Sequence, residues 1–192
     1  MSAPAESAAK LGDGPAGIPQ PVLVRGTGLL GASIGIGLSA AGVDVRLHDP
    51  SPAALAVAAD IRAGRPARLD AEGDDLDVAP GLVVVAAPPD VTADVVVDSL
   101  RRWPAAVVVD IASVKEAVAA GVRAAVDDGR LAPQDADRYL GTHPMAGSER
   151  SGPVAARGTL FTQAPWVLCP TDTTHPGALA AGRALARTLQ AT

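Results

Sequence analysis

A histidine, a serine and a glutamate lie close together in the run Gly141-Thr142-His143-Pro144-Met145-Ala146-Gly147-Ser148-Glu149. Pro144 and the flanking glycines exclude the interior of a helix. The run is typical of a strand over residues 139–142 that ends in a loop, which is where α/β proteins carry their ligand sites. Because an imidazole can take up a proton near neutral pH, His143 is the first candidate for a general base. The alternative is a structural histidine that bonds local backbone.

A glycine-rich turn, Gly26-Thr27-Gly28-Leu29-Leu30-Gly31, follows a short apolar strand over residues 22–24 and opens a helix. In this pattern the first glycine permits a tight turn, the second lets the backbone approach a pyrophosphate, and the third allows close helix–sheet packing. Backbone N–H groups at the start of the helix then face the phosphates. The turn therefore predicts a dinucleotide site formed by Gly26, Thr27, Gly28, Leu29, Leu30 and Gly31.

An aspartate, Asp49, ends the next expected strand, over residues 43–47. At this spacing from a glycine turn, a carboxylate binds the adenosine ribose hydroxyls and repels a 2′-phosphate, so NAD is favoured over NADP. The alternative is that Asp49, just before Pro50, shapes a turn. Arg46 and Arg62 are near in sequence and would weaken the preference for NAD if they reached the same site.

Apolar runs alternate with helical segments along the chain. Besides 22–24 and 43–47, strands are expected over 82–86, 106–111, 139–142 and 166–169, with a short one over 67–69. Helices are expected over 29–41, from Pro52 behind a Ser51 cap, and over 91–103, 113–126 and 176–189. The alternation predicts an α/β fold with a doubly wound, mostly parallel sheet of the Rossmann type. Ligands bind such sheets at the carboxyl ends of the strands.

A further serine, Ser113, follows the strand over 106–111 in the run Asp110-Ile111-Ala112-Ser113-Val114-Lys115. With Glu116 it matches an S-x-x-E capping box, which would explain this serine by helix capping alone. The run Ala86-Ala87-Pro88-Pro89 ends the strand over 82–86, and its double proline would stop the strand in any case.

The glycine turn, the Ser113-Val114-Lys115 run and the His143 run together resemble the prephenate/arogenate dehydrogenase family of tyrosine biosynthesis over roughly residues 21–192. The resemblance implies NAD-dependent oxidative decarboxylation of prephenate to 4-hydroxyphenylpyruvate, or of arogenate. It implies catalytic roles for His143 and Ser113 and contacts of Ala87 and Pro88 with the cofactor. It also implies a substrate pocket formed by Ser113, His143, Ser148 and Glu149.

Members of that family continue into a helical domain that dimerises, and this chain is expected to stop before it. The function therefore divides between a dehydrogenase, an NAD-binding module without turnover of its own, and another acid dehydrogenase of the same fold. The Ser113 and His143 runs disfavour the third. A homodimer is implied for full-length members.

Composition excludes several classes of partner. A net charge of −5 disfavours nucleic acid, and no stretch is apolar enough for a membrane span. Residues 1–20 are expected to be a disordered leader before a domain over 21–192, because they are rich in Ala, Gly, Pro and Ser and lack the pattern of a secretory signal. The single cysteine, Cys169, fits a cytoplasmic protein.

The remaining candidate side chains receive structural roles. The three histidines lack metal-ligand spacing, so no metal site is expected, and His48 and His175 are expected to be structural or solvated. Phe161 and Trp166 are expected in the core. Arg150 and Arg157 are equally compatible with a substrate carboxylate and with the surface.

Overall fold

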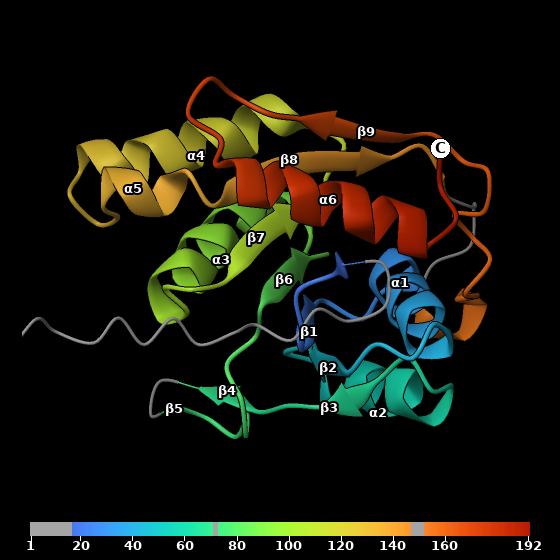
Figure 1. Ribbon diagram of the computed structural model, residues 1–192. Helices are drawn as coiled ribbons and strands as arrows, with labels where there is room; N and C mark the ends of the chain where they lie inside the picture. Colours follow the sequence, from blue (N-terminus) through green and yellow to red (C-terminus); the bar gives the residue numbers. More distant parts are fainter. Residues whose placement is uncertain (1–16, 71–72, 147–151) are drawn as a thin grey trace, which may run out of the picture.

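The protein is an α/β sandwich, seen here in a computed structural model that describes residues 17–70, 73–146 and 152–192 (Figure 1). A seven-stranded sheet has the order β3-β2-β1-β6-β7-β8-β9. Every pairing in it is parallel except that of β8 with β9, which is antiparallel. The Rossmann-type fold predicted from the alternation of strands and helices is thereby confirmed. The strands of this sheet are β1 (Val22–Arg25), β2 (Val45–His48), β3 (Arg65–Pro66), β6 (Leu82–Val85), β7 (Val107–Asp110), β8 (Tyr139–Pro144) and β9 (Trp166–Cys169).

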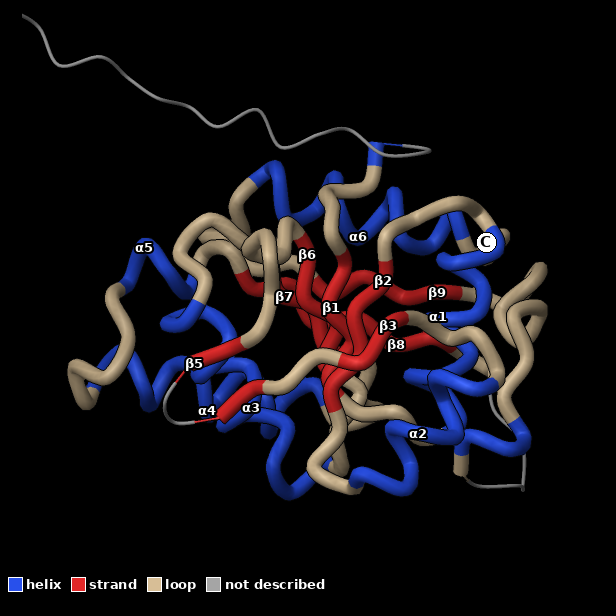
Figure 2. The backbone as a smooth tube through the Cα atoms, turned by 90° about the horizontal axis from the view of Figure 1, so that it is seen from below, coloured by secondary structure: helices blue, strands red, loops and turns tan. Residues whose placement is uncertain are grey.

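Helices cover both faces of the sheet (Figure 2). The side chains of β1 alternate between these two faces. Val22 and Val24 pack with α1, α2 and α6, whereas Leu23 packs with α3 and α4. Burial on both faces explains why the central strands are continuous apolar runs. The helices are α1 (Leu29–Ala40), α2 (Pro52–Asp60), α3 (Pro89–Arg102), α4 (Lys115–Asp127), α5 (Pro133–Ala136) and α6 (Pro176–Thr188), with a 3-10 turn η2 (Pro153–Ala155).

Two helix boundaries follow the expected local chemistry. The Ser51 side chain accepts a hydrogen bond from the Ala54 N–H (3.3 Å), and Pro52 takes the first position of α2. Gly42, just beyond the end of α1, has a φ of +80°, a left-handed conformation that glycine adopts without strain.

Three expectations about local structure were wrong. Ser113 and Glu116 do not form a capping box, because α4 begins at Lys115 with Val114 as its N-cap and no side-chain cap. The strand expected over 139–142 extends to Pro144, because pairing with β9 continues through His143 and Pro144. Of the segment expected over 67–69, only Leu69 lies in a strand: it begins β4 (Leu69–Asp70), which forms a separate antiparallel pair with β5 (Gly73–Asp74).

The ends of the described chain pack onto the domain. Most of the expected leader, residues 1–16, lies outside the described residues, but Ile18 is fully buried in the core and the Gln20 side chain accepts a hydrogen bond from the Asp44 N–H (2.7 Å). Packed structure therefore includes residues before Pro21. At the other end, the Thr192 carbonyl accepts a hydrogen bond from the Trp166 N–H beside β9 (2.8 Å). Among the described helices, we find none with the length and apolar character that crossing a membrane requires.

Candidate active site

A cavity of about 1200 Å³ opens along the carboxyl ends of β1, β2, β6, β7 and β8. Parallel strands end at the same edge of a sheet, so residues far apart in sequence meet there. The predicted site residues that line the cavity are Gly26, Gly28, Leu29, Leu30, Gly31, Asp49, Ala87, Pro88, Ser113 and His143. Thr27 is buried beneath the turn, and Ser148 and Glu149 lie outside the described residues.

The glycine turn lies against the end of β6 with no room for side chains at two of its three glycines. A Cβ atom on Gly26 would lie 2.4 Å from the Ala86 carbonyl oxygen, and one on Gly31 would lie 1.9 Å from the Gly26 carbonyl oxygen. Gly28 is exposed, and a Cβ atom there would meet nothing within 4 Å. Gly28 is also the N-cap of α1 and provides no side-chain cap, so the first N–H groups of the helix face the cavity without a capping side chain. Such an end suits an anion.

Asp49 braces this turn from the end of β2. Its Oδ2 accepts hydrogen bonds from the Thr27 N–H (2.6 Å) and the Thr27 hydroxyl (2.9 Å), and its Oδ1 accepts one from the Ser51 N–H (2.8 Å). Asp49 therefore does shape the local turn, as the alternative interpretation of this residue expected. Because a carboxylate has about four acceptor sites, and Asp49 lines the cavity, it retains capacity for a ligand hydroxyl.

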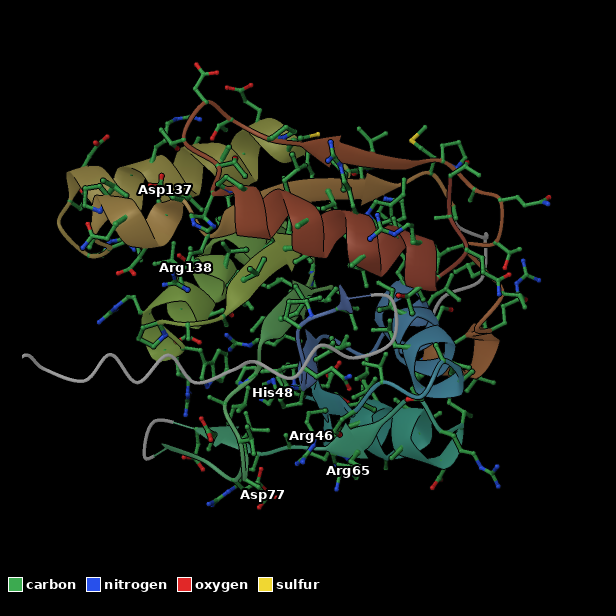
Figure 3. The ribbon with its side chains drawn as sticks, in the orientation of Figure 1. Arg46, His48, Arg65, Asp77, Asp137 and Arg138 are labelled. Carbon is green, nitrogen blue, oxygen red and sulfur yellow. The ribbon has the colours of Figure 1, made fainter. Side chains whose placement is uncertain are left out.

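The two arginines considered as modifiers of cofactor choice lie elsewhere. Arg46 is directed to Asp44 (3.2 Å) and Asp77 (3.6 Å), and neither Arg46 nor Arg62 lines the cavity. Arg46, Arg65 and Asp77 are grouped beside β2 and β3 (Figure 3). Arg25 does line the cavity, but its guanidinium donates to Asp98 (2.6 Å), Ser99 (2.8 Å) and the Val95 carbonyl (3.2 Å) on α3.

His48, expected to be only structural or solvated, is the last residue of β2 (Figure 3). It lines the cavity. Burial lowers the pKa of His48 below its ordinary value of 6.5, and the nearby guanidinium of Arg25 lowers it further. The imidazole is therefore held toward its neutral form beside Asp49.

Acid should weaken the fold through this histidine. Because the pKa of His48 is lower in the folded state, the unfolded chain binds more protons as the pH falls below 6.5, and the free energy of unfolding decreases with it. We expect His48→Gln, which cannot titrate, to lose less stability than the wild type between about pH 7 and pH 5. Denaturant unfolding at several pH values measures this. Parallel stability curves for the two proteins would contradict the assignment.

The end of the cavity that holds the candidate catalytic residues is formed by the segment after β7 and by β8. His143 is half-buried in β8, opposite Val167 of β9, and its Nδ1 lies 3.4 Å from the Ala112 carbonyl oxygen. Ser113 is exposed in the short connection between β7 and α4, next to Ala112. Because β7 and β8 are parallel neighbours, the two candidate catalytic side chains come to the same cavity.

A buried polar group beneath these residues was not assigned a role from the sequence. Asp110 is fully buried, and its carboxylate accepts hydrogen bonds from the Ala112 N–H (2.8 Å), the Tyr139 hydroxyl (2.7 Å) and the Lys115 ammonium. Burial raises the pKa of Tyr139, and the charge of Asp110 raises it further. Burial also lowers the pKa of Lys115, although its bond to Asp110 opposes this. The sequence signal that could have revealed this buried pair is an aspartate, Asp110, at the end of an apolar strand, with Lys115 five positions later.

Other candidates from the sequence do not meet at this site. Phe161 and Trp166 are buried and pack edge to face, with ring centroids 5.2 Å apart, which confirms their place in the core. Arg157 does not line the cavity, and Arg150 lies outside the described residues. In the described part of the chain no group of histidine, cysteine and acidic residues is arranged to hold a metal ion.

Comparison with known proteins gives a consistent family. Residues 36–192 match the model of the prephenate dehydrogenase nucleotide-binding domain. The chain is similar to the probable prephenate dehydrogenase NovF of Streptomyces niveus, with 38% identity over 157 residues, covering 82% of this chain and 40% of that protein.

Solved structures give the same picture. The arogenate dehydrogenase of Synechocystis superposes with a TM-score of 0.74 at 27% identity, covering 89% of this chain and 57% of that one. The prephenate dehydrogenase of A. aeolicus, solved in complex with hydroxyphenyl propionate and NAD+, has the same TM-score and coverage at 22% identity, a likeness that shows the fold alone. The chain thus spans about two fifths to three fifths of the length of these relatives.

Proposed function

Because this chain belongs to the prephenate dehydrogenase family, whose nucleotide-binding domain it matches over residues 36–192, we propose that it binds NAD and provides the catalytic base for oxidative decarboxylation of prephenate to 4-hydroxyphenylpyruvate in tyrosine biosynthesis. One observation carries the proposal. A single cavity is lined by the glycine turn, by Asp49 and by the Ser113–His143 pair. A dinucleotide that extends from the turn would place its reactive ring near these two side chains.

The residues present fit the cofactor. The uncapped start of α1 suits a pyrophosphate, Asp49 suits the ribose hydroxyls, and Ala87 and Pro88 form the cavity wall. A carboxylate at Asp49 disfavours a 2′-phosphate, and the one arginine among the described residues lining the cavity, Arg25, is engaged with Asp98. These features favour NAD over NADP.

The chain's own residues handle the proton and the orientation of the substrate. Prephenate has a ring carbon that carries a hydroxyl group, the carbinol carbon. NAD, when bound, supplies the acceptor for the hydride that leaves this carbon. His143 accepts the proton of the carbinol hydroxyl, while Ser113 holds that hydroxyl in place by a hydrogen bond. The ring carboxylate leaves as CO2 and the ring becomes aromatic, which makes the reaction strongly favourable. Ser148 and Glu149 are proposed to contribute to the substrate pocket.

Two alternative functions are each supported by one comparison. Arogenate differs from prephenate in its side chain, and the similarity to the Synechocystis arogenate dehydrogenase favours it as the second substrate. An NAD-binding module without turnover of its own is the other alternative, because the family model that the chain matches describes a nucleotide-binding domain. We further propose a cytoplasmic protein, in keeping with the free Cys169. Homodimerisation, implied for full-length members, stays a prediction.

A single assay separates these functions. The purified chain is mixed with NAD and either prephenate or arogenate, and NADH absorbance is followed. We expect NADH to form with prephenate. Formation with arogenate alone would reassign the substrate, and calorimetric binding of NAD without any NADH would identify the module. Absence of both binding and turnover would refute the proposal.

A further inference from the structure

Asp110 is buried and joins the two segments that carry the candidate catalytic side chains, by its carboxylate on one side and by its main-chain carbonyl on the other. Through the Ala112 N–H (2.8 Å) it fixes the connection that leads to Ser113. On the other side, the Thr142 hydroxyl donates to the Asp110 carbonyl (2.7 Å), which ties β7 to β8 one residue before His143. Asp110 is fully buried, so water does not compete for these bonds.

Lys115 completes this link with a second attachment to β8. Its ammonium donates to Asp110 Oδ1 and also to the Thr142 carbonyl oxygen (2.6 Å). The Lys115 side chain is only 20% exposed, and Lys115 does not line the cavity. Its ammonium is therefore engaged by protein groups and not by the described lining of the cavity. It bridges a buried carboxylate and the peptide group that joins Thr142 to His143.

The position of His143 determines which of its ring nitrogens can act as a base. The neighbour of Nδ1 is the Ala112 carbonyl oxygen, at 3.4 Å. A carbonyl oxygen can only accept, so this contact favours a proton on Nδ1. In the neutral imidazole that leaves Nε2 with the lone pair. Both partners of the contact are held by the same buried pair, Ala112 through Asp110 and His143 through Lys115 and Thr142.

We propose that Lys115 is a positioning residue for the catalytic base. Its bridge from Asp110 to the Thr142 carbonyl holds the His143 imidazole against the Ala112 carbonyl, so that Nδ1 keeps its proton and Nε2 is free to accept one from the substrate. This role rests on the proposed function of His143, but the arrangement of the imidazole is testable without turnover.

The test is nitrogen NMR of the histidine rings in the full 192-residue chain, at about pH 8, where an ordinary imidazole is neutral. The His143 signals are assigned by their loss in His143→Asn. We expect the wild type to show mainly the Nδ1–H form. In Lys115→Met we expect a mixture of both forms, because the imidazole is no longer held. Where the wild type turns over, Lys115→Met should lower kcat by about 10²-fold with little change in KM.

Tyr139→Phe is the matched control, since it also removes one donor from Asp110 but has no bond to Thr142. It should keep the tautomer of the wild type. A wild type with mainly Nε2–H, or a Lys115→Met ring like that of the wild type, would overturn the proposal. If Lys115→Met fails to fold, the comparison is made with Lys115→Gln, and a wild-type spectrum with mainly Nε2–H overturns the proposal in either case. Failure of the proposed function would instead appear as absent NADH formation, with the tautomer pattern intact.

Discussion

Replacing His143 with asparagine is expected to slow turnover by about 10²–10⁴-fold while leaving NAD affinity nearly unchanged. The amide of asparagine still forms hydrogen bonds but cannot take up the carbinol proton. The glycine turn and Asp49, to which we assign the phosphates and ribose, belong to other strand ends than β8. The two effects should therefore separate. Steady-state kinetics measures the first and calorimetric titration with NAD measures the second.

The control for this substitution is the same change at His175. His175 is exposed at the N-terminus of α6 and does not line the cavity, and its ring accepts a hydrogen bond from the Gly177 N–H (3.0 Å). Asparagine caps helices well, so His175→Asn should fold and turn over like the wild type. Normal turnover by His143→Asn would remove the catalytic role assigned to this histidine.

Replacing Gly28 with alanine is expected to weaken NAD binding by about 10–100-fold, which is about 1.4–2.7 kcal/mol. The substitution meets no protein atom within 4 Å, and the φ of Gly28, −65°, is accessible to alanine. Stability should therefore change little. The methyl group would project into the space proposed for the pyrophosphate, so the loss appears in affinity. Calorimetry and denaturant unfolding measure the two quantities on the same protein.

Gly31→Ala provides the contrast. Its Cβ atom would lie 1.9 Å from the Gly26 carbonyl oxygen, so the turn must move and the fold should lose about 1–3 kcal/mol or more. Gly28→Ala should thus impair binding without destabilising the fold, and Gly31→Ala should impair both. Unchanged NAD affinity in Gly28→Ala would place the pyrophosphate elsewhere.

The sheet was predictable because its central strands are buried on both faces. Runs such as Leu82–Val85 are apolar without alternation, and helices with clear start signals, such as Ser51-Pro52, separate them. The antiparallel direction of β9 was not predictable, since Trp166–Cys169 pairs with β8 through contacts distant from any local turn signal. The same pairing extends β8 through Pro144, where local sequence indicated a loop.

The site residues that belong to sequence motifs were predictable. The glycine turn, Asp49, Ser113 and His143 meet in one cavity because each follows or ends a strand of the parallel sheet. Their roles stay predictions. Local rules failed at Ser113, where the S-x-x-E spacing indicated a capping box, because the Asp110 side chain bonds the Ala112 N–H and α4 starts at Lys115.

Long-range contacts account for what local sequence did not reveal. The link from Asp110 through Lys115 to Thr142 joins residues up to 32 positions apart, and no local pattern reports it. The pairing of Arg46 with Asp77, 31 positions later, is likewise invisible to local sequence, and it helps to hold this arginine outside the cavity.

The most direct test of the central claim is the position of the nicotinamide ring relative to His143 in a crystal structure of the chain soaked with NAD. We expect the pyrophosphate at the Gly26–Gly31 turn and the nicotinamide next to the imidazole of His143 and the hydroxyl of Ser113. A nicotinamide directed away from both side chains, or NAD bound outside this cavity, would contradict it.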